Sequence, residues 1–433
     1  MNVAIIGFGI EGRSALHYWQ EQGAHITVCD HNTDVALPEN VASQLGEHYL
    51  HNLARFDVVV RSAGIPPEVL ISPNPGIEHK ITTVVNEFVK VCPTRNIIGI
   101  TGTKGKGTTS TMTKLMLETA GYKVFLGGNI GNSPFDFLGQ LTEDAWVVLE
   151  LSSYQLQDFT ARVPLAACLM MAEEHLTWHH TAEKYFSAKQ NLFGHQEAAD
   201  TAIYFADNER SHAIASTSPG KKIPYFAPPG AYMEDGRIVI DDQEICAVDD
   251  LQLLGKHNWQ NACAAATIVW QIFQKPDVIA SVLTSFTGLP HRLEFVREHN
   301  GIRYFNDSFA SAPPAAAAAA QAIAGSKVMI LGGFDRNLAL EEMVAGIHNE
   351  RDSVRAMLLV GASAERLASE LDAAGLNNFQ VSTAATMDQI VDEATALAKP
   401  GDAVVLSPGF PSFDMFTNFE ERGLAFKKSV SEL

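Results

Sequence analysis

The feature that most constrains the fold is a glycine-rich segment at residues 100–109, which reads Ile-Thr-Gly-Thr-Lys-Gly-Lys-Gly-Thr-Thr. It follows an apolar stretch typical of a strand and precedes a long helical pattern. A glycine-rich turn between a strand and a helix presents backbone N–H groups to a polyphosphate, and Lys106 is placed to neutralise the phosphate oxygens. The segment therefore predicts a nucleotide-binding α/β domain.

This loop departs from the common P-loop at two positions. The leading glycine, Gly99, lies one residue out of register, and Gly107 stands where a Ser or Thr normally follows the lysine. Because that hydroxyl usually contacts magnesium, the ion would have to be coordinated by Thr108, by Thr109 or by water. The alternative interpretation is a chance glycine turn. The loop residues expected to bind ATP are Gly102, Thr103, Lys104, Gly105, Lys106, Gly107 and Thr108.

A second glycine cluster, Gly-Phe-Gly-Ile-Glu-Gly at residues 7–12, also stands between an apolar strand and a helical pattern. Asp30 ends the next strand, about where an acid that binds a ribose would lie. Taken alone, these residues suggest an NAD-dependent enzyme. Since this motif also occurs in proteins that bind another nucleotide or none, it fixes a Rossmann-like unit more firmly than its ligand.

Short apolar strands alternate with helical stretches in three blocks, which predicts parallel, helix-covered sheets. We expect an α/β protein with three domains: a Rossmann-like domain at residues 1–92, a central P-loop domain at 93–288 and a C-terminal Rossmann-like domain at 289–433. Residues 202–248 are expected to be rich in strands. The alanines at 315–320 follow two prolines and predict the start of a helix. Expected strands lie at 3–6, 25–29, 58–60, 96–100, 146–149, 167–171, 303–306, 328–331, 356–360 and 403–406.

Charge and composition exclude several classes of partner. The 433 residues include 31 Lys and Arg against 50 Asp and Glu, a formal net charge of −19, which argues against nucleic acid and anionic membranes. No apolar run reaches the roughly 18 residues of a membrane span, and the N-terminus predicts a first strand rather than a signal peptide. The five cysteines lack metal-ligand spacing, so we expect them reduced, in a cytoplasmic protein. We expect small-molecule substrates and a monomer.

Three further residues are candidates for the chemistry. Glu150 ends an apolar strand, where a magnesium ligand beside a P-loop belongs. His175 follows Glu173 and Glu174 after another apolar strand, so we interpret it as a ligand, although a lone histidine is usually structural. Lys189 lies in a probable helix, and by itself it is best interpreted as a solvated surface lysine.

Five separated motifs, taken together and in order, resemble the Mur ligase superfamily. They are residues 101–106, 127–131, 150–156, 255–262 and 288–294. The resemblance covers nearly the whole chain and is strongest to the glutamate-adding members. It reassigns the first glycine cluster, because in such enzymes the Rossmann-like domain holds the uridine diphosphate of the substrate and not NAD.

The resemblance implies a role for individual residues. Lys106, His175 and Lys189 would be catalytic, and Lys189 matches a lysine that is carbamylated in the family. Magnesium ligands would be Thr108, Glu150, His175 and Lys189, and further ATP contacts Asn261, Arg292 and Asp307. The UDP-substrate would meet Ile10, Glu11, His31, Asn32, Ser62 and Asn129, and the incoming amino acid Ser311, Arg336, Ser412 and Phe419.

The activity implied is an ATP-dependent amide ligation in peptidoglycan synthesis, with ATP and Mg²⁺ required. A free carboxylate is a poor electrophile, so it takes the γ-phosphate of ATP to form an acyl phosphate, which the amine of glutamate then attacks. Mg²⁺ and Lys106 offset the repulsion between the carboxylate and the polyphosphate. The acceptor implied is UDP-N-acetylmuramoyl-L-alanine, and D-glutamate is the default amino acid.

Departures from the family pattern leave the stereochemistry of the glutamate open. Phe309 and Arg336 each stand where the family commonly has lysine, which remodels the amino-acid site and admits L-glutamate as an alternative. Met170 and Glu174 replace an Asn and an Asp.

Two other functions compete with this one. The Lys-Gly-Lys-Gly loop at residues 104–107 is close to that of folylpolyglutamate synthases, but those enzymes lack the N-terminal domain expected here. A non-catalytic nucleotide-binding protein is the second, against which the joint presence of Lys106, Glu150, His175 and Lys189 argues.

Overall fold

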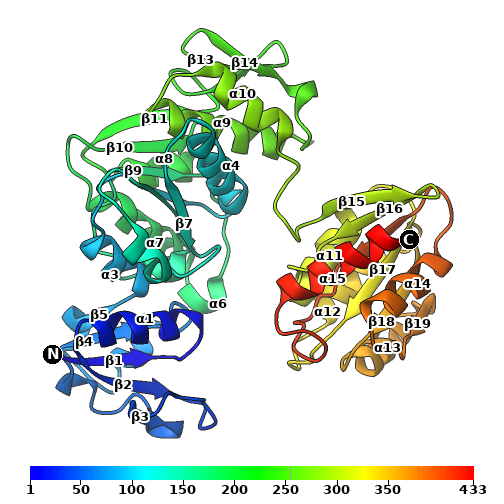
Figure 1. Ribbon diagram of the computed structural model, residues 1–433, viewed down its shortest axis with the longest axis horizontal. Helices are drawn as coiled ribbons and strands as arrows, with labels where there is room; N and C mark the ends of the chain where they lie inside the picture. The colour runs from blue at the N-terminus through cyan, green and yellow to red at the C-terminus, as the bar shows by residue number, and fades with distance from the viewer. Residues whose placement is uncertain (254) are drawn as a thin grey trace. The chain divides into compact units, whose positions relative to one another are not determined.

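The computed structural model describes residues 1–253 and 255–433, and the chain forms two compact units, Met1–Phe286 and Thr287–Leu433 (Figure 1). The first unit contains three sheets and the second contains one. The α/β class predicted from the strand–helix alternation is confirmed. The boundaries at residues 92/93 and 288/289 stay predictions.

The first sheet of the N-terminal unit is parallel, with strand order β3-β2-β1-β4-β5. Alternate residues of β1 point to opposite faces, so Val3 and Ile5 pack in a different core cluster from Ala4 and Ile6. Apolar burial on both faces is expected of a parallel sheet covered by helices. The elements are β1 Asn2–Ile6, α1 Ile10–Glu21, β2 His25–Asp30, β3 Ala42–Leu45, β4 Val58–Arg61, α2 Pro67–Ile71, β5 Ile81–Thr82 and α3 Val84–Val91.

The second sheet is also parallel, with order β11-β10-β9-β6-β8-β7, and a small antiparallel sheet, β12-β13-β14, follows it in the chain. The strands are β6 Ile97–Thr101, β7 Val124–Gly128, β8 Trp146–Glu150, β9 Leu165–Cys168, β10 Thr201–Phe205, β11 Lys221–Tyr225, β12 Tyr232–Glu234, β13 Arg237–Ile240 and β14 Gln243–Ala247. The helices are α4 Lys106–Thr119, α5 Ser153–Leu156, α6 Leu176–His179, α7 Ala182–Gly194, α8 Glu209–Ala215, α9 Lys256–Trp270 and α10 Pro276–Ser285.

These two sheets belong to one unit because their cores merge. Tyr18 of α1 stacks on Phe135 at 4.0 Å between ring centroids, and Phe88 of α3 meets Phe137 edge-on at 5.5 Å. Both phenylalanines lie in the segment between β7 and β8. One apolar cluster therefore runs from β1 to the helices around β8.

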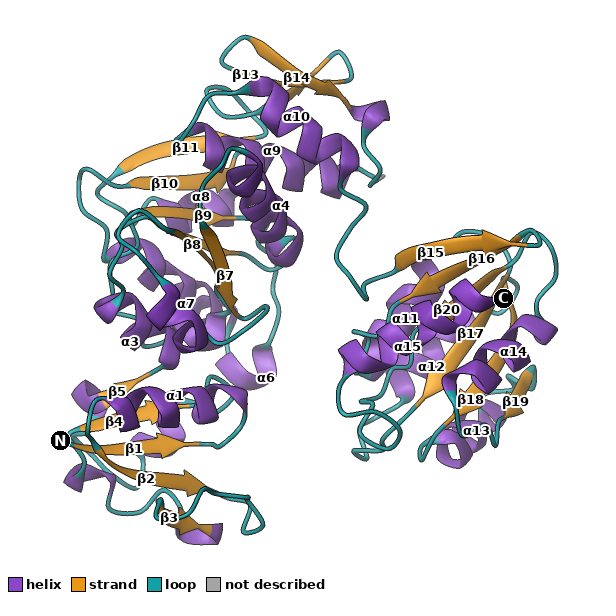
Figure 2. Cartoon of the chain, viewed as in Figure 1, coloured by secondary structure: helices purple, strands orange, loops and turns teal. Residues whose placement is uncertain are grey.

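The C-terminal unit has one six-stranded sheet, β15-β16-β20-β17-β18-β19, parallel except for the pair β15–β16 (Figure 2). Separate apolar clusters cover its two faces, one with α11, α12 and α13 and the other with α14 and α15. The elements are β15 Glu294–His299, β16 Ile302–Asn306, α11 Pro313–Ala322, β17 Lys327–Gly332, α12 Glu341–Asn349, β18 Val354–Val360, α13 Ala364–Ala373, β19 Phe379–Val381, α14 Met387–Leu397, β20 Ala403–Leu406 and α15 Phe419–Glu432.

The strand predictions are confirmed except in one position. The strand expected at 167–171 runs from Leu165 to Cys168, because the chain leaves the sheet to reach the loop that carries His175. The alanine tract forms α11, residues 202–248 hold five strands in whole or in part, and all five cysteines are free and buried. No helix within residues 1–253 and 255–433 is long and apolar enough to cross a membrane.

Candidate active site

The glycine-rich loop joins β6 to α4, as predicted. Gly105 caps the helix with φ +88°, a conformation that favours glycine, and Lys106 is the first helical residue. A Cβ atom at position 105 would lie 2.2 Å from Oδ1 of Asn261 on α9. The loop is therefore closely packed against Asn261, which the family resemblance had assigned to ATP.

Backbone carbonyls of the loop fix the position of the Lys106 ammonium group. Its Nζ atom donates to the carbonyl oxygens of Gly102 at 2.9 Å and Thr103 at 3.0 Å. Thr108 is half-buried, whereas Thr109 is fully buried and its Oγ1 atom has no hydrogen-bond partner. The hydroxyls next to Gly107 thus lie in the first turn of α4, at its N-terminal end.

Glu150 lies beside this loop because β8 is the neighbour of β6 in a parallel sheet. Its side chain is only 5% exposed, and Oε1 accepts a hydrogen bond from Nδ2 of Asn129 at 2.9 Å. The backbone N–H of Asn129 also donates to the Glu150 carbonyl at 2.8 Å. The predicted metal ligand and the predicted contact to the substrate arm are therefore joined by two hydrogen bonds.

His175 follows β9, the other neighbour of β6, and starts α6 with φ +58°. Burial lowers the pKa of its imidazole, and the cations of Lys106 and Lys189 lower it further against the opposing effect of Glu174. Glu174 itself forms an ion pair with Lys104 at 2.9 Å. The carboxyl ends of three adjacent strands therefore bring the loop, Glu150 and His175 to one edge of the sheet.

Lys189 is not a surface lysine. It lies on α7 at 1% exposure, and Nζ donates to Oγ1 of Thr101 at 3.1 Å and to the carbonyl oxygen of Gly102 at 3.0 Å. Burial, and then the nearby charge of Lys106, lowers the pKa of the Lys189 amine to about 7. The Tyr185 ring lies 5.0 Å from Nζ. A large part of the amine is thus neutral near pH 7, so it is nucleophilic.

A pocket with a cavity of about 310 Å³ lies between the first and second sheets. Of the residues expected to bind the UDP-substrate, it brings together Ile10, Glu11 and Asn129. The other lining residues are Ala63, Gly64, Gly128, Gly131, Ser133, Ser152, Tyr154 and Gln155.

The other expected substrate residues lie outside this lining. His31 and Asn32 follow β2 and are exposed, and Ser62 follows β4. Asp30, the acid that suggested a ribose site, accepts backbone hydrogen bonds from Phe8 at 2.7 Å and Asn32 at 2.9 Å. Its carboxylate therefore ties the glycine loop to the end of β2.

Sequence reasoning did not assign Gln155, Tyr154 or Tyr185 to the site. Gln155 caps α5 reciprocally with Ser152 and donates through Nε2 to Oε1 of Glu11 at 3.0 Å. The spacing Ser-x-x-Gln is a capping-box pattern and could have shown the turn, though not the contact with Glu11. Tyr185 is bonded through its hydroxyl to Oγ1 of Thr103 at 2.9 Å, a contact between α7 and the loop that no local pattern reveals.

In the C-terminal unit, Asp307 follows β16 and is buried. Its Oδ2 atom accepts from the hydroxyl of Ser407 at 2.7 Å, and Oδ1 accepts from the backbone N–H of Leu293 at 3.1 Å. Burial raises the pKa of Asp307 to about 6, although these hydrogen bonds and the nearby charge of Arg292 lower it. Asp307 and Ser407 end neighbouring strands, so they also lie at the carboxyl edge of a sheet.

Phe309, which replaces the lysine of the family pattern, lies between two other expected site residues. The Arg292 guanidinium stands 3.9 Å from the centroid of its ring, and Phe419 meets it edge-on at 5.1 Å. The structure thus brings Arg292 and Phe419 together through an aromatic side chain. Arg336 stacks separately on the ring of Phe413 at 5.4 Å. Ser412 is buried and Ser311 is exposed.

The oxygen-rich donors near the loop fit a magnesium ion bound together with a nucleotide. Within residues 1–253 and 255–433, no group of three or more His, Cys, Asp or Glu side chains is arranged to hold a metal alone. Mg²⁺ characteristically binds one or two carboxylates and completes its shell with substrate phosphates and water. A single buried carboxylate, Glu150, beside a P-loop matches that requirement.

The fold and this site define a nucleotide-binding protein of the P-loop class, built from parallel α/β sheets. Comparisons with known proteins match residues 1–84 to the N-terminal domain of MurD-like Mur ligases, 100–269 to the Mur ligase middle domain and 291–410 to the Mur ligase, glutamate ligase domain. The chain belongs to the Mur ligase family.

Curated relatives match over the full length. The UDP-N-acetylmuramoylalanine–D-glutamate ligase of Clostridium novyi (strain NT) is 34% identical, with 100% of this chain and 96% of that protein covered. The enzyme of the same name from Acetivibrio thermocellus is also 34% identical, with the same coverage. These relatives place the chain among the glutamate-adding members.

Solved structures share the fold at low identity. UDP-N-acetylmuramate-alanine ligase MurC from Thermotoga maritima has a TM-score of 0.56 at 14% identity, covering 100% of this chain and 99% of that chain. MurF ligase from the same organism, solved in complex with ADP, has a TM-score of 0.56 at 15% identity, covering 99% and 94%. The three-domain Mur ligase fold expected from the sequence is thereby confirmed.

Proposed function

We propose that this chain is an ATP-dependent ligase that joins D-glutamate to UDP-N-acetylmuramoyl-L-alanine in peptidoglycan synthesis. The observation that carries the proposal is the full-length match to D-glutamate ligases together with the packing of Lys106, Glu150 and Lys189 around one P-loop. The L-glutamate alternative has no support from these relatives, whose names specify D-glutamate.

The proposed division of labour follows the three predicted domains, at residues 1–92, 93–288 and 289–433. The first would hold the UDP-substrate through Ile10 and Glu11, with His31, Asn32 and Ser62 nearby. The second would bind ATP through residues 102–108 and Asn261. The third would supply Arg292 and Asp307 to the nucleotide and Ser311, Arg336, Ser412 and Phe419 to glutamate.

The first chemical step is phosphoryl transfer. A carboxylate oxygen of the substrate forms a bond to the γ-phosphorus, the bond to the β,γ-bridging oxygen breaks, and ADP leaves with that electron pair. Lys106 would oppose the charge that builds up on the phosphate oxygens. Mg²⁺, held by Glu150, His175 and the Thr108 hydroxyl, would supply further neutralisation of the polyphosphate when bound.

The second step is amide formation. The neutral amine of glutamate attacks the acyl carbon, the tetrahedral intermediate expels phosphate, and the amine loses a proton. Asn129 lies on the pocket side of Glu150, so the substrate arm and the ATP loop approach each other there. Holding the acyl carbon and the amine in contact would supply part of the rate enhancement, because it removes the entropic cost of bringing them together.

Lys189 is proposed to be carbamylated. Its neutral amine would attack CO₂ to form an N–C bond and release a proton, which turns the side chain into an anion close to Lys106. The lowered pKa and the buried position support this, because only the unprotonated amine reacts. The anion would complete the set of oxygen donors beside Glu150.

Four further properties remain proposals. We propose that the protein works in the cytoplasm, as a monomer and without nucleic-acid or membrane partners. The net charge of −19 and the absence of a membrane-spanning helix in residues 1–253 and 255–433 support the last two.

The test is phosphate release with UDP-N-acetylmuramoyl-L-alanine and ATP, offering D- or L-glutamate separately. We expect turnover with D-glutamate, dependence on Mg²⁺, and none in a Lys106→Ala variant. Turnover with L-glutamate alone contradicts the stereochemistry. Turnover with a folate acceptor instead contradicts the substrate, although the match of residues 1–84 to a Mur ligase N-terminal domain argues against it. Nucleotide binding without any turnover would indicate a non-catalytic protein.

A further inference from the structure

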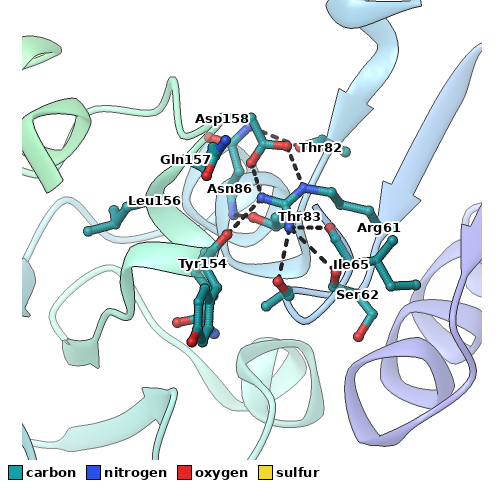
Figure 3. Close-up of polar contacts among 12 residues, drawn as sticks. Arg61, Ser62, Ile65, Thr82, Thr83, Asn86, Tyr154, Leu156, Gln157 and Asp158 are labelled. Carbon is teal, nitrogen blue, oxygen red and sulfur yellow. Dashed lines mark hydrogen bonds and ion pairs between the residues drawn. The ribbon is translucent and has the colours of Figure 1, made fainter. Parts of the chain in front are cut away.

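Arg61, the last residue of β4, is a completely buried arginine that takes no part in the proposed chemistry (Figure 3). Its guanidinium lies between the turn at residues 62–65 and the short helix α5. Charged side chains are almost never fully buried unless they are paired, and a guanidinium carries five N–H donors that all need acceptors. The acceptors it uses connect two segments about 90 residues apart in the chain.

On the side of the second sheet, Arg61 donates hydrogen bonds to α5 and to the residue Asp158 that follows it. Its Nε atom donates to Oδ2 of Asp158 and its Nη2 atom to Oδ1, both at 2.7 Å. Nη2 also donates to the carbonyl oxygen of Tyr154 at 2.7 Å. Because α5 spans only Ser153–Leu156, its carbonyls have no partners inside the helix. Arg61 therefore caps α5 and fixes its position with a bidentate ion pair.

On the side of the first sheet, Arg61 donates hydrogen bonds to the backbone carbonyls of the turn that follows it. Nη1 lies 3.4 Å from the carbonyl oxygen of Ser62 and 3.2 Å from those of Ala63 and Ile65. With its carbonyls directed inwards, the turn presents the backbone N–H of Ala63 to Oε2 of Glu11 at 3.2 Å. One guanidinium thus sets both the conformation of the turn and its separation from α5.

These two segments are opposite walls of the 310 Å³ pocket. Ala63 and Gly64 line it from the turn, and Tyr154 and Gln155 line it from α5. On the pocket side the walls are joined through Glu11 of α1, which accepts hydrogen bonds from Nε2 of Gln155 and from the backbone N–H of Ala63. Behind the walls, Arg61 joins the same two segments but lines no part of the pocket.

We infer that Arg61 and Asp158 are a positioning pair that sets the width of the pocket, and so determines how well the anionic UDP-substrate binds there. The inference rests on the proposed function for the identity of that ligand. Asp158 neutralises the positive charge of Arg61, so this charge does not attract the substrate. Its contribution is geometric, because a planar fork bound to a carboxylate and to four carbonyls holds one spacing, which an ammonium group would not.

A second bidentate ion pair, which lies just before β9 and β10 and in which the arginine is 39% exposed and also bound to Glu197, provides a control away from the pocket. Nε of Arg162 donates to Oδ2 of Asp200 at 2.9 Å and Nη2 to Oδ1 at 2.8 Å. Neither residue lines the pocket or contacts its walls. A variant at Arg162 therefore reports the general effect of losing a bidentate pair from this unit.

The experiment compares Arg61→Lys, Arg61→Met, Asp158→Asn and Arg162→Met in the full-length chain. It measures kcat, KM for UDP-N-acetylmuramoyl-L-alanine, KM for ATP and the melting temperature. For Arg61→Lys we expect KM for the UDP-substrate to rise roughly tenfold with KM for ATP unchanged, since a misplacement of about 1 Å can cost up to about a hundredfold. Asp158→Asn should shift the same constant in the same direction, and Arg162→Met should lower only the melting temperature.

Equal changes in both KM values, or a lower melting temperature with unchanged KM in Arg61→Lys and Asp158→Asn, would show that the pair is only a structural support. If Arg61→Met does not fold, Arg61→Lys and Asp158→Asn still test whether the pair controls binding of the UDP-substrate. Turnover by the wild type tests the proposed function separately. A wild type that neither turns over nor binds UDP-N-acetylmuramoyl-L-alanine in a calorimetric titration overturns both, whereas an active wild type with unaffected variants overturns only this inference.

Discussion

The Nζ atom of Lys189 donates a hydrogen bond to Oγ1 of Thr101, 3.1 Å away at the carboxyl end of β6. That hydroxyl in turn donates to the carbonyl oxygen of Leu151 at 2.8 Å. A lysine in the second half of α7 is thereby held at the start of the P-loop. Because Lys189 is buried and lies close to Lys106, the pKa of its amine falls to about 7.

The first prediction is that activity depends on a carbamate at Lys189. We expect Lys189→Ala to lose roughly 100- to 1,000-fold in kcat, the range for removing one preorganised group from a charged transition state, and to regain part of it with added short-chain carboxylates. Activity of CO₂-depleted enzyme should recover when CO₂ is added, and at equal dissolved CO₂ it should recover faster at pH 8 than at pH 6, because the neutral fraction of the Lys189 amine rises through pH 7. An alanine variant with wild-type kcat would contradict the carbamate.

The second prediction concerns the contact between the P-loop and Asn261. Gly105→Ala should abolish ATP binding, since the added methyl group would lie 2.2 Å from Oδ1 of Asn261 and the backbone has φ +88°. Gly121→Ala is the matched control, because its φ is +97° and nothing lies within 4 Å of the added Cβ. Nucleotide titration measures both. Because Gly121 follows the far end of α4, an ATP affinity in Gly105→Ala as high as in Gly121→Ala would show that the contact with Asn261 does not govern nucleotide binding.

The third prediction tests Phe309, which stands where the family pattern has lysine. Phe309→Lys should raise KM for glutamate and for ATP, because it removes the ring from Arg292 and puts a second cation beside the guanidinium. Phe309→Leu keeps the apolar contact and loses only the cation–π interaction, worth about 0.5–1 kcal/mol at an exposed site, or a factor of roughly two to five. Steady-state kinetics distinguish the two. A lower KM for glutamate in Phe309→Lys would mean that the lysine binds the amino acid directly in this chain as well.

Much of the fold could be predicted because the informative patterns are local. A strand, a glycine turn and a helix at residues 97–119 define the P-loop without any knowledge of the remaining chain. The rule that ligands gather at the carboxyl ends of parallel strands placed Glu150 and His175 correctly beside it, once their strands were recognised. Edge strands such as β3, β5 and β19 were missed, since two to four residues carry too little periodicity.

The rest of the site depends on contacts that no local pattern encodes. Lys189 has the sequence environment of a surface lysine, and its burial follows only from how α7 packs on β6. Arg61 and Asp158 are 97 residues apart, and Glu11 and Gln155 are 144 apart. The sequence contains both partners of each pair, but only the merging of two sheets into one core brings them together.

The fourth prediction is a pH dependence of stability in the C-terminal unit. Burial raises the pKa of Asp307 to about 6, against about 3.9 in an unfolded chain. The folded chain therefore holds this proton more firmly, so the stability contributed by the protonated group is lost as pH rises through 6. At pH 7.5 Asp307→Asn should have a higher melting temperature than the wild type, and its free energy of unfolding should be larger by at most about 3 kcal/mol. Both differences should disappear near pH 4.

Asp402 supplies a control of the opposite sign in the same unit. Hydrogen bonding to Arg355 lowers the pKa of its carboxyl, so its ionised form stabilises the fold above the unfolded pKa and that contribution is lost as pH falls. Asp402→Asn should therefore melt lower than the wild type at pH 7.5, with most of that difference retained at pH 4 and lost only below the unfolded pKa of about 3.9. Thermal melts of both variants at pH 4 and pH 7.5 decide the matter. If the two substitutions shift the melting temperature in the same direction at pH 7.5, burial does not control the Asp307 carboxyl as proposed.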